Sequence, residues 1–82
     1  MNRSAILDHL REAKQELDQT ICDIADDPEY DIGEFRVAMS HLYHHLNTAW
    51  NGRDATDEAH LKCAEADFDA WRRFPNNSEL LL

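Results

Sequence analysis

The sequence predicts an all-α fold, a small antiparallel up-down-up bundle of three helices. Three segments carry apolar residues at steps of three and four, which places those residues on one face of a helix. The chain has only 2 prolines, and both fall between or after these segments. The main alternative is a helix hairpin that pairs with a second copy, so that self-association builds a larger helical bundle.

The first predicted helix covers residues 4–25. Ser4 is a residue type that caps helix N-termini, and Pro28 favours a break after the helix because proline disfavours helical geometry at the residue before it. The apolar residues of this segment are Ile6, Leu10, Ala13, Leu17, Ile21 and Ile24. Their spacing predicts one continuous apolar stripe.

The second predicted helix, residues 32–52, is the central one. Asp31 is expected to cap its start, and Gly52 favours a stop at its end. Its apolar stripe consists of Phe35, Met39, Leu42, Leu46, Ala49 and Trp50. We expect the flanking helices to pack on this stripe.

The third predicted helix covers residues 56–74, with Thr56 as N-cap and Pro75 as the residue that ends it. One face carries Leu61, Ala64, Phe68 and Trp71. A second face carries the small residues Ala59, Cys63, Ala66 and Ala70. Small residues permit close helix approach, so this second face predicts the contact of a dimer.

These helices form one expected domain, residues 1–75, followed by a short tail, residues 76–82, that ends in Leu80, Leu81 and Leu82. A chain of 82 residues buries only a small core. The residues expected in that core are Leu10, Leu17, Ile21, Phe35, Met39, Leu42, Leu46, Phe68 and Trp71.

The charge of the chain limits its partners. Its 8 basic and 17 acidic residues give a formal net charge of −9, which disfavours binding to nucleic acids and to anionic membranes. Neither a transmembrane segment nor a signal peptide is visible, so we expect a cytoplasmic location. Cys22 and Cys63 are expected to be buried thiols, too far apart along the bundle axis for a disulfide.

The histidines are the main candidates for chemistry. His41 and His45 have the i, i+4 spacing of helical metal sites. His60 and Asp67 share a stripe of the third helix, and Asp67 is expected at the same height along the bundle as His41 and His45. The favoured interpretation is a structural hydrogen bond between Asp67 and a histidine of the second helix. Such a partner would raise the pKa of that histidine and make the protein more stable near about pH 6 than near about pH 8. The alternative is a metal site formed by His41, His45, His60 and Asp67, with His9 as a further candidate.

Two short patterns do not extend to a family. Arg36 and His41 have the R-x4-6-H spacing, and this segment resembles HEPN-type ribonucleases, but Val37 stands where that family has a polar residue. The acidic segment 23–34 has the length of an EF-hand loop, but Pro28 stands where that loop requires glycine. The sequence identifies no family.

We therefore expect a small acidic helical protein that acts through protein–protein contact, as a homodimer or with a basic partner. No catalytic residue and no cofactor is predicted. The alternative function is that of a metal-binding or hydrolytic helical bundle, which would use the candidate histidines together with Asp67.

Overall fold

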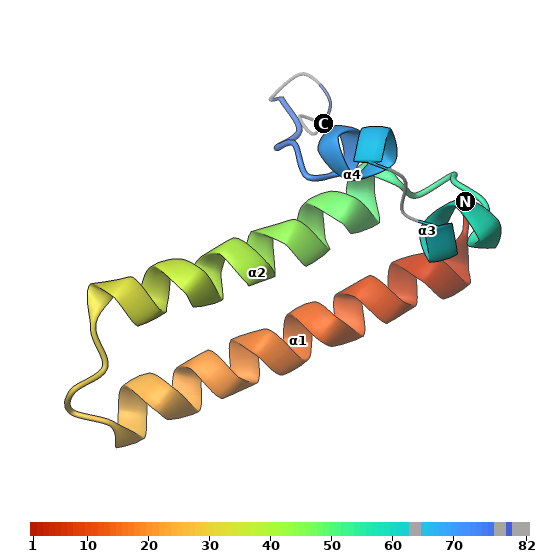
Figure 1. Cartoon of the computed structure of the whole chain (residues 1–82). Helices are drawn as coiled ribbons and strands as arrows, with labels where there is room; N and C mark the ends of the chain where they lie inside the picture. Colours follow the sequence, from red (N-terminus) through yellow and green to blue (C-terminus); the bar gives the residue numbers. More distant parts are fainter. Residues whose placement is uncertain (63–64, 77–78, 80–82) are drawn as a thin grey trace.

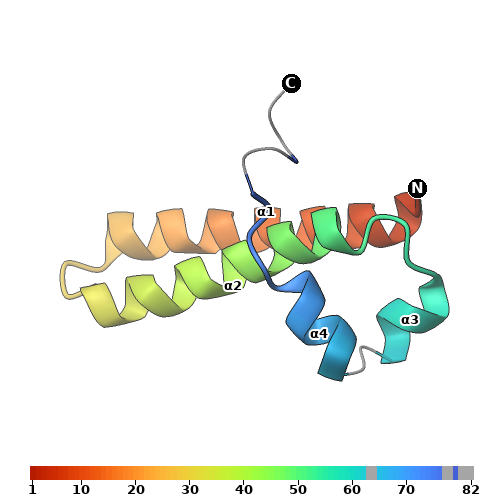
Figure 2. The same ribbon diagram turned by 90° about the horizontal axis from the view of Figure 1, so that it is seen from above.

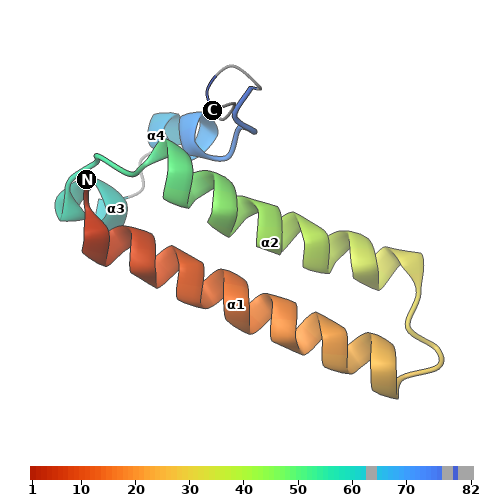
Figure 3. The same cartoon turned by 180° about the vertical axis from the view of Figure 1, so that it is seen from behind.

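The computed structural model describes residues 1–62, 65–76 and 79, and within them it contains helices and no strand. The all-α prediction is therefore confirmed for this part of the chain. The helices are α1 (Arg3–Asp26), α2 (Ile32–Asn51), α3 (Asp57–Lys62) and α4 (Glu65–Trp71). The two long helices, α1 and α2, pack side by side as an antiparallel hairpin (Figures 1 and 3).

The third long helix, and with it the three-helix bundle, is not confirmed. Its residues form the short helices α3 and α4, which lie at the end of the hairpin where α1 begins and α2 ends (Figure 2). The Trp71 and His60 rings lie 4.7 Å apart between centroids. On one straight helix, eleven residues would separate them by about 16 Å along the axis. The chain must therefore turn between these two residues.

Asn2 caps α1, in place of the predicted Ser4. The Asn2 side-chain oxygen accepts the Ala5 N–H at 3.1 Å. The Asn2 side-chain amide donates to the Ala55 carbonyl at 2.9 Å, and the Asn2 backbone N–H donates to the Arg53 carbonyl at 2.6 Å. These bonds tie the start of α1 to the segment that follows α2.

The other predicted helix boundaries agree better with the structure. Asp31 caps α2, since its side chain accepts the Glu34 N–H at 2.9 Å. The Thr56 hydroxyl accepts the Ala59 N–H at 3.1 Å immediately before α3. Gly52 is the C-cap of α2, although its φ of −96° lies outside the left-handed region that favours glycine.

The core is smaller than the sequence suggested. Among the described residues, the buried apolar ones are Ala5, Ala13, Ala49 and Trp71. The prediction for Trp71 is thus confirmed, whereas Met39 and Leu42 are only partly buried. The prediction is wrong for six residues, each at least 37% exposed: Leu10, Leu17, Ile21, Phe35, Leu46 and Phe68. Two helices alone bury only a narrow strip, and α3 and α4 add cover at one end.

Two further expectations changed with the fold. Cys22 is an exposed free thiol rather than a buried one, and Cys63 lies outside the described residues, as do Ala64 and Leu80 to Leu82. Ala59 and Ala70, two members of the predicted small-residue face, belong to different short helices and so do not share the face of one continuous helix. Among the described helices, none combines the length and the hydropathy that crossing a membrane requires.

Candidate functional site

One side of the hairpin is apolar, and we call it the apolar face. It consists of Leu10, Leu17, Ile21 and Ile24 of α1 and Ile32, Phe35, Met39 and Leu46 of α2. On each helix these residues lie about 80° around the axis from the side that faces the other helix, at 100° per residue. Because the helices are antiparallel, the same sense of rotation brings both stripes to the same side of the hairpin.

The apolar face is open along much of its length. Ile21 is 58% exposed, Ile24 51% and Ile32 71%, so the part near the α1–α2 loop is the most accessible. Near the other end, Leu10 and Leu46 line a shared hollow of about 280 Å³, which confirms that the two stripes lie on one side.

The other side of the hairpin, which we call the histidine face, carries His9, Glu12 and Glu16 of α1 and His41 and His45 of α2. His45 Nδ1 lies 3.1 Å from Glu12 Oε2, and His41 Nδ1 lies 3.5 Å from Glu16 Oε1. Glu16 follows Glu12 by four residues on α1, and the partner of Glu16, His41, precedes the partner of Glu12, His45, by four residues on α2. The antiparallel register therefore places two histidine–glutamate pairs one helical turn apart.

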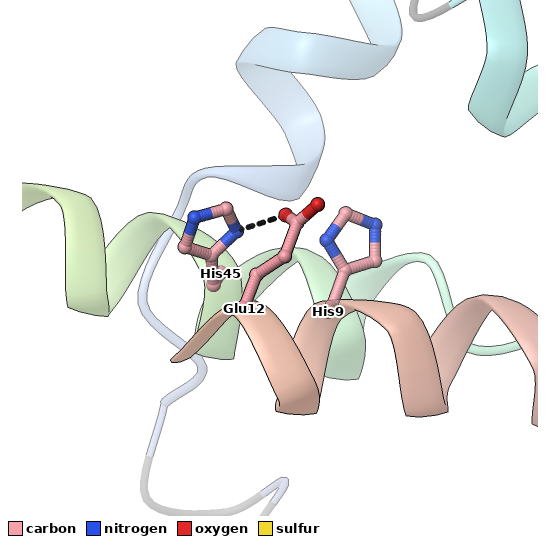
Figure 4. A group of neighbouring side chains, drawn as sticks. All are labelled: His9, Glu12 and His45. Carbon is pink, nitrogen blue, oxygen red and sulfur yellow. Dashed lines mark ion pairs between the residues drawn. The ribbon is translucent and has the colours of Figure 1, made fainter. Parts of the chain in front are cut away.

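A third ligand-type side chain joins only one of these pairs. One possible ligand atom each from His9, Glu12 and His45 lies within 4.8 Å of the other two. Figure 4 shows the Glu12 carboxylate between the two imidazole rings. Nδ1 of His9 and Nδ1 of His45 are both buried without a hydrogen-bond partner. The 3.1 Å approach of His45 to Glu12 thus does not meet the geometry of a hydrogen bond, and it is an ion pair only when the His45 ring is protonated.

His60 extends this cluster toward α4. Its ring centroid lies 5.5 Å from that of His9. His60 Nε2 lies 2.9 Å from the Gly52 carbonyl oxygen, and because a carbonyl only accepts, the histidine nitrogen is the donor. A Cβ at position 52 would lie 2.9 Å from His60 Cε1. The close approach of His60 therefore favours glycine at this position.

Burial controls the charge of two histidines in this region. It lowers the pKa of His9 below its ordinary value, and the neighbouring His60 acts in the same direction, while Glu12 opposes both. Burial also lowers the pKa of His44, with a further contribution from His45. Both histidines therefore favour the neutral imidazole near neutral pH.

The four candidate ligands from the sequence do not form one group in the described structure. His45 lies in the three-residue cluster, His60 lies beside it, and His41 forms the separate pair one turn away. Asp67 is partly exposed in α4, and no ion pair or hydrogen bond links it to a histidine among the described residues. The hydrogen bond expected between Asp67 and the second helix is absent from this part of the chain.

Glu12 is the member of the cluster that sequence reasoning missed. His9 and Glu12 are three residues apart and so share one side of α1, which is a detectable signal. Their relation to His45 depends on how α1 pairs with α2, and no local pattern reports that register.

No family model, curated protein or solved structure matches this chain. Any function therefore has to be inferred from the two faces of the hairpin themselves.

Proposed function

We propose that this chain is a protein-interaction module that pairs with a second copy of itself through the apolar face of the α1–α2 hairpin. Two hairpins stacked by these faces would form a four-helix bundle. The observation that carries the proposal is the row of large apolar side chains that the single chain leaves exposed. A face of this kind on a small chain is typical of an interaction surface.

The surface area of the chain supports a second copy. The chain exposes 6322 Å², whereas a compact monomer of 9.5 kDa is expected to expose about 5,000 Å². The excess of about 1,300 Å² exceeds the ~800 Å² that each partner buries in a standard interface. The radius of gyration of 14.4 Å likewise exceeds the ~12 Å expected for a compact chain of this length.

The spacing of the apolar residues also supports a helical partner. On the apolar face, Leu10, Leu17, Ile21 and Ile24 follow steps of seven, four and three residues along α1. This is the seven-residue pattern of helices that pack lengthwise against other helices. A two-fold axis would let the same stripe on both chains serve as both halves of the interface.

The charge distribution places repulsion away from the proposed contact. Glu16, Asp23 and Glu34 line one pocket together with His41, on the histidine face. By helix periodicity, Lys14 and Arg36 border the apolar face instead. The net charge of −9 is therefore not concentrated where two copies would meet.

The decisive experiment is sedimentation equilibrium of wild type, Leu17→Glu and Val37→Glu over a range of concentrations. Leu17 lies on the apolar face and is 45% exposed, whereas Val37 lies beside Glu34 in the acidic pocket and is 56% exposed. The two variants make the same change of charge at similarly exposed apolar residues, so Val37→Glu is the matched control.

We expect wild type and Val37→Glu to sediment as dimers and Leu17→Glu as a monomer of 9.5 kDa. A disrupted anchor costs at least about 2 kcal/mol, and a symmetric dimer contains it twice, so affinity should fall on the order of a thousandfold. Circular dichroism would verify that Leu17→Glu keeps its helices. A wild type that stays monomeric at the highest concentration, or a dimeric Leu17→Glu, would refute pairing through this face.

A further inference from the structure

We propose that His9, Glu12 and His45 form a binding site for one divalent transition-metal ion, with Zn²⁺ as the representative ligand. The site lies on the histidine face and draws its ligands from both helices, so a bound ion would cross-link α1 to α2. It does not depend on the proposed dimer, which uses the opposite side of the hairpin.

The donor set suits such an ion. Two imidazoles and one carboxylate are a common ligand set of zinc and of non-haem iron. Ligands at about 2.0–2.1 Å from a tetrahedral zinc ion lie about 3.3 Å from one another. The 3.1 Å between His45 Nδ1 and Glu12 Oε2 is already close to that spacing. All three ligand atoms lie within 4.8 Å, so a small side-chain movement would complete the set.

Neither imidazole nitrogen makes a hydrogen bond, although the Glu12 carboxylate, the third member of the cluster, lies 3.1 Å from His45 Nδ1. His9 Nδ1 and His45 Nδ1 are buried without a hydrogen-bond partner, an arrangement that costs free energy unless a ligand satisfies them. Burial lowers the pKa of His9, which favours the neutral ring that a metal requires. Glu12 is flexible enough to adjust, because its side chain is 57% exposed.

Three protein ligands leave a coordination position open, as in catalytic rather than structural zinc sites. His9 and Glu12 also line a pocket of about 490 Å³, together with Asp57 and His60. The open position is therefore expected to be accessible to water or to a small oxygen- or nitrogen-donor ligand.

The chain contains its own control for this site. His41 and Glu16 form a histidine–glutamate pair one turn away, between the same two helices. Among the described residues, only the pair of His45 and Glu12 has a third possible metal ligand close by. If any histidine–glutamate pair could bind the metal, changes in either pair would weaken binding to the same extent. The proposed three-ligand site instead depends on His45 and Glu12 and not on His41 or Glu16.

The test is calorimetric titration of ZnCl₂ into tag-free protein that has been stripped with chelator and dialysed. Wild type and His41→Gln should bind one ion per chain with similar affinity. His45→Gln and Glu12→Gln should each bind at least about tenfold more weakly, since even residues that only support a ligand contribute about 10- to 100-fold. Glu12 is largely exposed, so Glu12→Gln remains informative if a histidine variant fails to fold.

Two further measurements distinguish this site from loose surface binding and from a site shared between two chains. Co²⁺ in place of Zn²⁺ should give the intense visible absorption of a four-coordinate ion, and Glu12→Gln should lose it. Leu17→Glu should bind Zn²⁺ as wild type does, because the site lies within one chain. Absence of saturable Zn²⁺ binding, or equal binding by wild type and by both the His45→Gln and Glu12→Gln variants, would overturn the proposal.

Discussion

Replacing Trp71 by alanine should detach α4 from the hairpin. Trp71 is 8% exposed and is the one large side chain among the buried apolar residues that the structure describes. Its ring packs on His60, and its carbonyl oxygen accepts a hydrogen bond from the Asn51 side chain at 2.8 Å. Because the other buried apolar residues of the described chain are alanines, they offer little apolar surface to compensate for the lost ring.

The expected loss follows from the buried area. A buried tryptophan removes about 150–250 Å² from water, which at ~25 cal/mol per Å² corresponds to about 4–6 kcal/mol as an upper bound. Measured changes of buried aromatic residues to alanine cost about 3–5 kcal/mol. We therefore expect the free energy of opening α4 away from the hairpin to fall by about 3–5 kcal/mol. If that opening free energy is smaller than this loss in wild type, it should fall to zero.

Amide hydrogen exchange measures this opening residue by residue. The Arg72 N–H donates to the Phe68 carbonyl at 3.1 Å and therefore reports the end of α4. It should lose protection in Trp71→Ala, while amides in the middle of α1 and α2 keep theirs. Phe74→Ala, at a residue that is 67% exposed, is the control and should cost less than about 1 kcal/mol. Unchanged protection of the Arg72 amide, or an equal loss of protection along α1 and α2, would contradict the prediction that Trp71 holds α4 alone in place.

The remaining predictions concern the histidines and two helix ends. The pKa values of His9 and His44 are lowered in the folded state, so the unfolded chain binds more protons below about pH 6.5 and stability is lost as pH falls from there. In urea unfolding with chelator present, wild type should lose more stability than His9→Gln between about pH 7.5 and about pH 5.5, and equal losses would contradict this sign. Gly52→Ala should displace the His60 ring and cost on the order of 1 kcal/mol in urea unfolding, since one partly buried hydrogen bond is lost. A neutral effect would mean that the ring moves freely. Asp31→Ala removes the α2 cap and should cost about 0.5–2 kcal/mol, whereas Asp31→Asn, which keeps the cap, should cost much less.

The direction of the pH prediction differs from the one that the sequence suggested. A histidine paired with Asp67 would have a raised pKa and would stabilise the protein toward acid. The described residues instead contain histidines whose burial lowers the pKa. A sequence shows that histidines and carboxylates lie on facing stripes, but burial and distance decide the sign of the shift.

The two long helices could be predicted from the sequence because their signals are local. The Asp31 side chain caps α2 by accepting the N–H of Glu34, only three residues further along the chain. The steps of three and four that define each apolar stripe likewise lie within one segment of the sequence. The third long helix was not confirmed, because a contact between residues distant in the sequence decides the structure of that segment. Helical patterning continues to Trp71, but the contact between Trp71 and His60 joins residues eleven positions apart and overrides it.

Local patterning was thus enough to establish that the chain forms two amphipathic helices and that each carries one apolar stripe. Packing between distant segments was needed to place both stripes on the same open side of the hairpin. It also set the register that brings Glu12 and His9 to His45 and leaves Asp67 apart. The rotation of a helix about its axis, and its register against a neighbour, depend on contacts between residues far apart in the chain. The periodicity of a single segment therefore predicts neither the rotation of the helix nor its register.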